Sequence, residues 1–335
     1  MGATISSATI KDGLINFGMS WYTATVIYFV CYNCGVRLGC YTIVTLLLAL
    51  AGVGDHAEVW AAPSRAKKAS TVKRWQTLAS PPALPTPTQS GDVNSAGIKI
   101  HYAEFGQGQP VVLLHGGMGS GDQMALQVAG LVASYRVIVI DSRGQGRSEP
   151  TDQGMHYTQL ADDVIAVLDA LKIDQAAFVG WSDGGVVGLQ LGLRHCARVA
   201  GLWLLATNYD VAGMQSAGSS ALFADYWKDC ATRWADNGVA TTDADKVRKA
   251  LRTMWRSEPK ISEKFLRTMN APTRVVLGDH DEILRRPHVA RLVALLPNSK
   301  FVLLRDVSHF ALWQDAVAVN RSIVELLTEI WPPTP

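Results

Sequence analysis

The sequence has little excess of charge of either sign. Its 31 Lys and Arg residues nearly balance 29 Asp and Glu residues, which gives a formal net charge of +2 over 335 residues. Nucleic acids favour proteins with a clustered basic surface, so this balance argues against a nucleic-acid partner. It does not exclude a small charged substrate. Apolar residues make up 48% of the chain, which is enough for a sizeable core.

Cysteine is scarce, and its distribution argues against two classes of protein. The five cysteines are odd in number and scattered, which does not fit a disulfide framework. Cys31 and Cys34 have the spacing of a zinc or redox motif, but no second Cys/His pair follows at zinc spacing. We therefore expect no metal and no cofactor.

Nucleotide-binding loops and internal repeats are also lacking. No G-x-x-x-x-G-K-[ST] sequence occurs, and the stretch GQGRSE at 144–149 lacks the third glycine of a dinucleotide-binding loop. No repeat recurs at a spacing of about 20–50 residues, which argues against a solenoid or a propeller.

The first two zones of the chain differ in composition from the rest. Residues 1–61 hold two apolar stretches, 14–32 and 41–53, with Arg37 between them. This zone predicts a signal or membrane-anchor-like segment, and with it export or membrane association. If the segment is not a targeting signal, we expect a cytoplasmic protein. Residues 62–91 are rich in Pro, Ser and Lys and predict an extended linker.

The third zone, residues 92–335, alternates short apolar runs with amphipathic stretches. Runs such as VVLL and VIVI indicate strands buried on both faces. We therefore predict an α/β fold, in which a mostly parallel central sheet has helices on both faces. The predicted strands span 98–104, 111–115, 137–141, 177–181, 202–206, 274–278 and 301–304. The predicted helices span 122–133, 157–171, 184–193, 287–296 and 313–330.

One stretch interrupts this alternation of strands and helices. Residues 208–269 contain helical patterns but no strand pattern. Because they follow a predicted strand, we predict that they form a small helical cap over a site at the edge of the sheet. Trp227 in this cap is a candidate for substrate binding.

The strongest motif surrounds Ser182. The sequence GWSDGG at 180–185 follows a predicted strand and opens a predicted helix. This is the G-x-S-x-G elbow in the context that the motif requires. The glycines leave room for close passes of the main chain, and the helix directs its N–H groups toward developing negative charge. We predict that Ser182 is a nucleophile and that Trp181 lies beside it in the substrate site.

A serine hydroxyl is a weak nucleophile and needs a base, which a third group must orient. His309 follows the last predicted strand, and its loop returns to the edge of the sheet where Ser182 lies. Asp281 follows the preceding strand, so the chain order Ser, Asp, His fits a hydrolase triad. Asp279 in the same loop and the more distant Asp210 remain alternatives for the acid.

Two backbone N–H groups are expected to stabilise an oxyanion. One belongs to Asp183, directly after the nucleophile. The other lies in the glycine-rich loop HGGMGS at 115–120, where we choose Gly117, with Met118 as the alternative.

The sequences LLHGG, DSRGQGRS, GWSDGG, GDHD and SHF, in this order, resemble those of the α/β-hydrolase superfamily, in its serine hydrolase branch. The resemblance covers about residues 101–330 and implies that 208–269 is the family's cap. GWSDGG and LLATNYDV are similar to the valacyclovir-hydrolase-like group, which cleaves α-amino acid esters. That similarity implies that the Asp183 carboxylate binds a substrate ammonium group. The alternative is that this side chain is bonded only to protein groups nearby.

Together these features predict a serine hydrolase that cleaves a small or medium carboxylic ester through an acyl-enzyme. A carbon–carbon bond hydrolase, a lactonase and a cofactor-free perhydrolase are alternatives that use the same three residues. A non-enzymatic binding module predicts a broken triad, whereas all three positions are filled.

Overall fold

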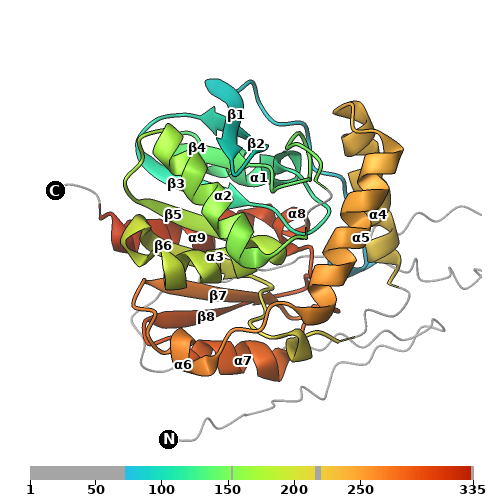
Figure 1. The fold of residues 1–335 in the computed structure, drawn as a ribbon. Coiled ribbons are helices and arrows are strands. Elements are labelled where there is room, and N and C mark those ends of the chain that lie inside the picture. The colour runs from blue at the N-terminus through green and yellow to red at the C-terminus, as the bar shows by residue number, and fades with distance from the viewer. Residues whose placement is uncertain (1–71, 152–153, 216–219, 333–335) are drawn as a thin grey trace, which may run out of the picture. The chain divides into compact units, whose positions relative to one another are not determined.

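A computed structural model describes residues 72–151, 154–215 and 220–332, which form one eight-stranded sheet flanked by helices (Figure 1). The strand order is β1-β2-β4-β3-β5-β6-β7-β8. The strands are β1 (Gln89–Ser95), β2 (Ile98–Phe105), β3 (Gln109–Leu114), β4 (Tyr135–Ile140), β5 (Ala176–Trp181), β6 (Val199–Leu205), β7 (Thr273–Gly278) and β8 (Ser299–Leu304). All neighbouring pairs from β4 to β8 are parallel, so the predicted mostly parallel sheet is confirmed.

The antiparallel edge of the sheet contains a strand that the sequence analysis did not predict. β1 pairs antiparallel with β2, and β2 with β4. Ala96 and Gly97 connect β1 to β2 with φ angles of 49° and 85°, the conformation of a tight hairpin turn. β1 has the polar sequence QSGDVNS and is mostly exposed, so it carries no hydrophobic alternation. The sheet therefore begins at Gln89, inside the predicted linker.

The helices cover both faces of the sheet, as predicted. Helices α2 and α3 pack together on one face, and α1, α8 and α9 pack together on the other (Figure 1). α7 packs against β7 and β8. The bounds are α1 (Ala125–Leu131), α2 (Tyr157–Ala170), α3 (Asp183–Arg194), α7 (Arg286–Leu295), α8 (Ala311–Gln314) and α9 (Ala316–Ile330). Single 3-10 turns, η1 to η4, span Arg74–Gln76, Gly121–Met124, Cys196–Arg198 and Val211–Gly213.

The last predicted helix is divided in two. Asp315 separates α8 from α9, and its carboxylate accepts a hydrogen bond from the Ala318 N–H at 3.0 Å. An aspartate at this position satisfies a free N–H group of the first helical turn, so it starts a new helix.

The stretch between β6 and β7 contains helices α4 (Ala221–Asp236), α5 (Thr241–Ser257) and α6 (Glu263–Leu266). In Figure 1, α4 and α5 stand together beside one end of the sheet. α4 is bonded to the glycine-rich loop after β3: the Tyr226 hydroxyl donates to the Gly117 carbonyl at 2.7 Å, and the Trp234 indole lies 3.4 Å from the Gly119 carbonyl. The cap helix α4 therefore contacts the loop predicted to hold an oxyanion.

The described part of the predicted linker is tied to the domain that contains the sheet. We call residues 74–81 the strap. The Arg74 guanidinium donates to the backbone carbonyls of Arg305 at 2.8 Å and Asp306 at 3.2 Å, in the loop after β8. At the other end of the strap, Arg233 of α4 donates to the Pro81 carbonyl at 2.8 Å. The strap thus connects the cap to the loop before α8.

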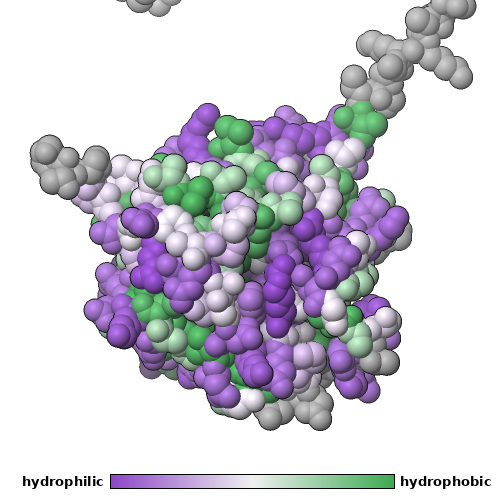
Figure 2. Space-filling view, turned by 90° about the horizontal axis from the view of Figure 1, so that it is seen from above, coloured by the Kyte–Doolittle hydropathy of each residue, from purple (hydrophilic) through white to green (hydrophobic). Residues whose placement is uncertain are grey.

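The segment predicted as a signal or anchor, residues 1–61, lies outside the described residues. Within the part of the chain that the structure describes, no helix has the length and hydropathy needed to span a bilayer. The face shown in Figure 2 carries hydrophilic residues over much of its area, with hydrophobic residues in separate groups between them.

A buried ion pair fixes the loop after β4 against α2 and the β1–β2 turn. The Arg143 guanidinium donates to both carboxylate oxygens of Asp163, at 2.9 and 2.6 Å, and to the Ser95 carbonyl at 3.2 Å. The Ser95 hydroxyl donates to the same carboxylate at 2.6 Å. The Arg143 and Asp163 side chains are only 2% and 3% exposed. Loss of one partner would therefore leave the other charge buried and unpaired.

We expect Asp163→Ala to lower the free energy of unfolding by about 3–5 kcal/mol, because Arg143 would remain buried without its counter-ion. Urea denaturation measures the change. The matched control is Asp245→Ala, which breaks an exposed pair with Arg248 on α5 and should cost less than about 1 kcal/mol. Equal losses in the two variants would contradict this account of the buried pair.

Candidate active site

Ser182 lies on a sharp turn between β5 and α3. Its φ of 54° is in the left-handed region, which is strained for a residue with a side chain. A Cβ atom at Gly180 would collide with the Gly184 backbone, and one at Gly184 would collide with the Leu114 carbonyl. Glycine at these two positions therefore allows the close passes of main chain that bring the Ser182 hydroxyl out at the edge of the sheet.

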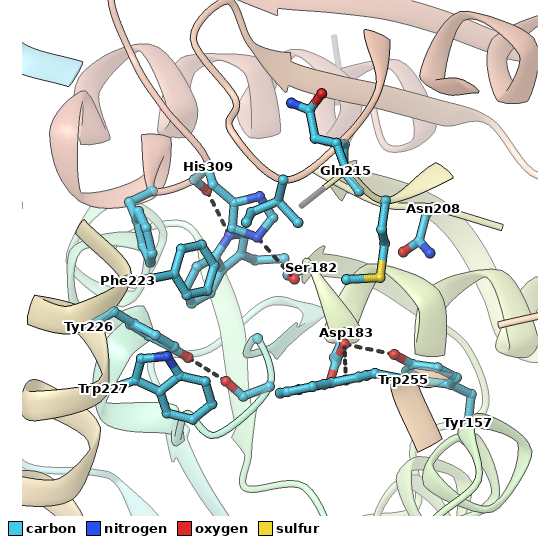
Figure 3. Close-up of a pocket in the computed structure, with 17 residues that line it drawn as sticks. Tyr157, Ser182, Asp183, Asn208, Gln215, Phe223, Tyr226, Trp227, Trp255 and His309 are labelled. Atoms are coloured by element: carbon cyan, nitrogen blue, oxygen red, sulfur yellow. Dashed lines mark hydrogen bonds between the residues drawn. The ribbon is translucent and has the colours of Figure 1, made fainter. Parts of the chain in front are cut away.

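The structure brings the three predicted catalytic side chains together. His309 Nε2 lies 3.1 Å from Ser182 Oγ, and His309 Nδ1 lies 3.0 Å from Asp281 Oδ2 (Figure 3 shows the first contact). The His309 and Asp281 side chains are 3% and 1% exposed. This is the geometry in which an imidazole accepts the serine proton while a carboxylate orients the ring.

The turn after β7 decides between the candidate acids. The other carboxylate oxygen of Asp281 accepts hydrogen bonds from the N–H groups of Ile283 at 2.9 Å and Leu284 at 2.8 Å. Asp279 instead lies 3.4 Å from the Val307 N–H, and Asp210 accepts from Ala212. Neither of these alternatives contacts His309. Asp281 is therefore the carboxylate that the fold holds against the imidazole.

Burial and charge have opposite effects on the His309 imidazole. Burial alone would lower its pKa, but the negative charge and hydrogen bond of Asp281, with smaller contributions from Glu282 and Asp183, raise the pKa above the usual value for histidine. The site therefore stabilises the imidazolium form of His309.

The backbone of His309 is held from both sides. The Trp181 indole N–H donates to the His309 carbonyl at 2.9 Å, and the His309 N–H donates to Glu282 Oε2 at 3.1 Å. The Trp181 ring also packs edge-on against Tyr226 and Phe310. Trp181, which the sequence analysis predicts to bind substrate, lines the pocket and also fixes the backbone of His309.

The expected oxyanion donors lie beside the nucleophile. The structure shows no hydrogen bond from the backbone N–H of Asp183 or Gly117 to any described residue. A Cβ atom at Gly117 would collide with the Trp255 ring and the Asp183 carboxylate. Met118, the alternative donor, has a φ of 65° and a buried side chain. The glycine at position 117 is therefore required by close packing beside Ser182.

The Asp183 carboxylate is bonded to two neutral donors. Oδ1 accepts the Tyr157 hydroxyl at 2.7 Å, and Oδ2 accepts the Trp255 indole N–H at 2.8 Å (Figure 3). Burial raises the pKa of Asp183, while these two hydrogen bonds lower it. Burial and the Asp183 charge also raise the pKa of Tyr157 far above its usual value, so Tyr157 stays a neutral donor.

These side chains enclose a cavity of about 200 Å³. Aromatic rings from the cap form much of its wall, and Trp227, predicted to bind substrate, is one of them. The polar groups on the opposite side are Asn208 and Gln215 (Figure 3). None of the described residues lining the cavity is Lys or Arg.

Several residues of the site were not predicted from the sequence. Tyr157 begins α2, and Trp255 is near the end of α5; they meet at Asp183 only in the folded chain. Glu282 follows the predicted acid, Asp281, directly in the sequence, but it belongs to no motif and was not predicted. The GDHDE sequence could have drawn attention to Glu282, but no local pattern marks Tyr157 or Trp255.

One group of possible metal ligands lies among the described residues outside the cavity. Ligand atoms of Asp279, His280 and Asp306 lie within 4.8 Å of one another. His280 and Asp306 are exposed, the His280 ring stacks on Trp75 at 4.3 Å, and an Arg305 nitrogen lies 4.0 Å from Asp279. Neither the candidate base nor the nucleophile belongs to this group.

Comparison with known proteins gives one consistent family. A family model described as alpha/beta hydrolase fold matches residues 109–234. The solved structure of Est816, an N-acyl homoserine lactone degrading enzyme, is similar with a TM-score of 0.60 and 30% identity, over 70% of this chain and 99% of that one. Serine hydrolase BPHL of Mus musculus is 26% identical over 264 residues, 74% of this chain and 91% of the relative. A 2-hydroxy-6-oxononadienedioate/2-hydroxy-6-oxononatrienedioate hydrolase of Cupriavidus pinatubonensis is 27% identical over 263 residues, 68% of this chain and 90% of the relative.

The contacts of His309 lead to a prediction about its titration. We expect the imidazole to titrate above the usual histidine range in the native protein, and at lower pH after Asp281→Asn, because that variant removes the main anion that favours the charged ring. NMR of protein labelled at histidine Cε1 measures the titration. Asp279→Asn removes a carboxylate that does not contact His309 and should leave the titration unchanged; a displacement as large as that of Asp281→Asn would contradict the assignment.

Proposed function

Because the chain belongs to the α/β-hydrolase superfamily, we propose that it is a serine hydrolase that cleaves small or medium carboxylic esters through an acyl-enzyme on Ser182. The observation that carries this proposal is the pair of hydrogen-bond contacts, Ser182 to His309 and His309 to Asp281. They supply the nucleophile, the base and the orienting acid that acyl transfer needs.

Each residue has a defined part in the reaction. His309 Nε2 takes the proton from the Ser182 hydroxyl while the oxygen attacks the ester carbonyl carbon. The carbonyl oxygen becomes an oxyanion, which the N–H groups of Asp183 and Gly117 bind. The imidazolium, stabilised by Asp281, then gives its proton to the departing alcohol. A water molecule, deprotonated by the same imidazole, hydrolyses the acyl-enzyme.

The charge of the cavity supports a neutral or cationic substrate. The hydrolase of Cupriavidus pinatubonensis is named for dioate substrates, which carry two carboxylates. A dicarboxylate would lose its hydration in this cavity and find Asp183 but no Lys or Arg among the described lining residues. An ester that carries no free carboxylate therefore suits the cavity better than a dicarboxylate whose carbon–carbon bond is cleaved.

A lactone is the second candidate substrate class. The observation in its favour is the 30% identity to Est816, an N-acyl homoserine lactone degrading enzyme. Opening a lactone uses the same steps at Ser182 as cleaving an open-chain ester, with the alcohol remaining attached to the acyl group. Comparison of a γ-lactone with an open-chain ester of the same acyl group would separate the two classes.

We expect Ser182→Ala to reduce turnover of p-nitrophenyl butyrate by about 10⁴-fold or more, because no other group would attack the carbonyl carbon. The variant should also resist labelling by a fluorophosphonate probe, which reacts with activated serines. Circular dichroism and urea denaturation verify that it is folded. A folded Ser182→Ala protein with normal turnover would overturn the proposal.

We also propose that the Asp183 carboxylate pairs with the ammonium group of an α-amino acid ester. Its two hydrogen-bond partners, Tyr157 and Trp255, are neutral, and no Lys or Arg among the described residues of the cavity offsets its charge. A substrate ammonium would provide that partner and add a charge-assisted hydrogen bond.

We expect Asp183→Asn to lower the preference for a valine ester over the 3-methylbutyrate ester of the same alcohol by about tenfold or more, because these substrates differ only in the ammonium group. The ratio of the two kcat/KM values is the measurement. The neutral ester serves as the internal control, since the backbone N–H at position 183 is retained. An unchanged ratio would mean that the carboxylate serves only Tyr157 and Trp255.

A further inference from the structure

Glu282 is a second carboxylate behind the base, and the mechanism above does not use it. It follows Asp281 in the loop after β7. Asp281 contacts the imidazole ring of His309, whereas Glu282 Oε2 accepts the backbone N–H of the same histidine at 3.1 Å. Its other oxygen, Oε1, is buried and has no hydrogen-bond partner among the described residues. A buried carboxylate oxygen without a partner costs free energy, so its retention calls for an explanation.

The surroundings of Glu282 favour its charge more strongly when the His309 ring is charged. Burial raises the pKa of Glu282, and the neighbouring Asp281 charge raises it further. The opposing effects come from the ring charge and the backbone N–H of His309 and from the backbone N–H of Glu282 itself. The charge of the imidazolium is the largest of the effects that favour the ionised carboxylate.

The titratable and charged groups that face the imidazole come from two elements. Asp281 and Glu282 lie in the loop after β7, and Ser182 and Asp183 lie at the start of α3. Of the three carboxylates, Asp281 alone is hydrogen-bonded to the ring. Glu282 and Asp183 act on the imidazole by charge.

Resting on the proposed serine hydrolase function, we propose that Glu282 is a positioning residue with an electrostatic role: Oε2 fixes the His309 backbone, and its negative charge favours the imidazolium that forms when Ser182 gives up its proton. The charge then contributes most in the transition state, where the imidazolium develops.

The sign of the pH effect follows from this role. Catalysis needs the neutral imidazole, so kcat/KM falls as the pH drops through the pKa of His309. The negative charge of Glu282 raises that pKa. Removing the charge should move the acid limb of the pH profile to lower pH and also lower the plateau, because the imidazolium in the transition state would lose a counter-charge.

Three variants of the full chain separate the two parts of the role. Glu282→Gln keeps the shape and an oxygen acceptor for the His309 N–H but removes the charge. Glu282→Ala removes both. Asp279→Asn removes a carboxylate from the same loop that does not contact His309, and its profile should superimpose on that of the native protein.

The experiment measures kcat/KM for p-nitrophenyl butyrate across pH, together with the NMR titration of His309 in the same proteins. We expect Glu282→Gln to move both the acid limb and the titration to lower pH. Its plateau should fall by less than the roughly 100-fold or more that loss of a general base costs. Glu282→Ala should fall further, because the backbone of His309 loses its acceptor.

Two outcomes would overturn the inference. One is a Glu282→Gln profile that superimposes on the native profile in both position and plateau. The other is a lower plateau with an unmoved acid limb and an unmoved His309 titration, which would leave Glu282 a purely structural role. The NMR titration does not depend on turnover, so a weakly active variant still gives a result. Failure of the proposed serine hydrolase function is distinguishable from failure of this inference, because it would appear as normal turnover by the Ser182→Ala variant.

Discussion

The backbone of Ser182 is held in a left-handed conformation, and the other parts of the site are arranged around that constraint. A residue with a side chain in this region costs about 1–3 kcal/mol, which the surrounding fold must offset. The sheet does so by fixing β5 between β3 and β6, and the glycines at 180 and 184 let α3 begin directly against the end of β3. Gly117 and Asp183, whose N–H groups are the proposed oxyanion donors, line the same cavity as the Ser182 side chain.

Negative charge is concentrated around one imidazole, and each carboxylate is held in a different way. Asp281 is held by backbone N–H groups of its own loop, Asp183 by two neutral side chains, and Glu282 by the backbone of His309. All three favour a positive charge on the ring. In the proposed reaction, the counter-charge is therefore in place before the proton leaves Ser182, and no large movement is needed.

The sequence was informative where a reactive side chain comes directly after a buried strand. Ser182, Asp281 and His309 each come just after an apolar run, and parallel strands end at one edge of a sheet, so their meeting could be predicted. The sequence could not fully separate Asp281 from Asp279, because the distinction depends on the turn after β7. In that turn, the N–H groups of Ile283 and Leu284 bind the carboxylate of Asp281. β1 was missed because it is polar and exposed, and it pairs through a hairpin turn. Asp183 is bonded to Tyr157 and Trp255, which lie in distant segments of the chain. No local sequence pattern predicts these two contacts.

The strap makes residues before the first strand part of the folded domain. It lies before the first strand, yet it is bonded to α4 through Pro81 and to the loop preceding α8 through Arg74. The Thr77 carbonyl also accepts from Gln314, whose side chain in turn accepts the Ser308 N–H, one residue before the base. A shortened protein starting at Gln89 would keep every strand while losing these ties. Residues 74–81, although they lie outside the sheet, therefore belong to the structure that holds the loop of His309 in place.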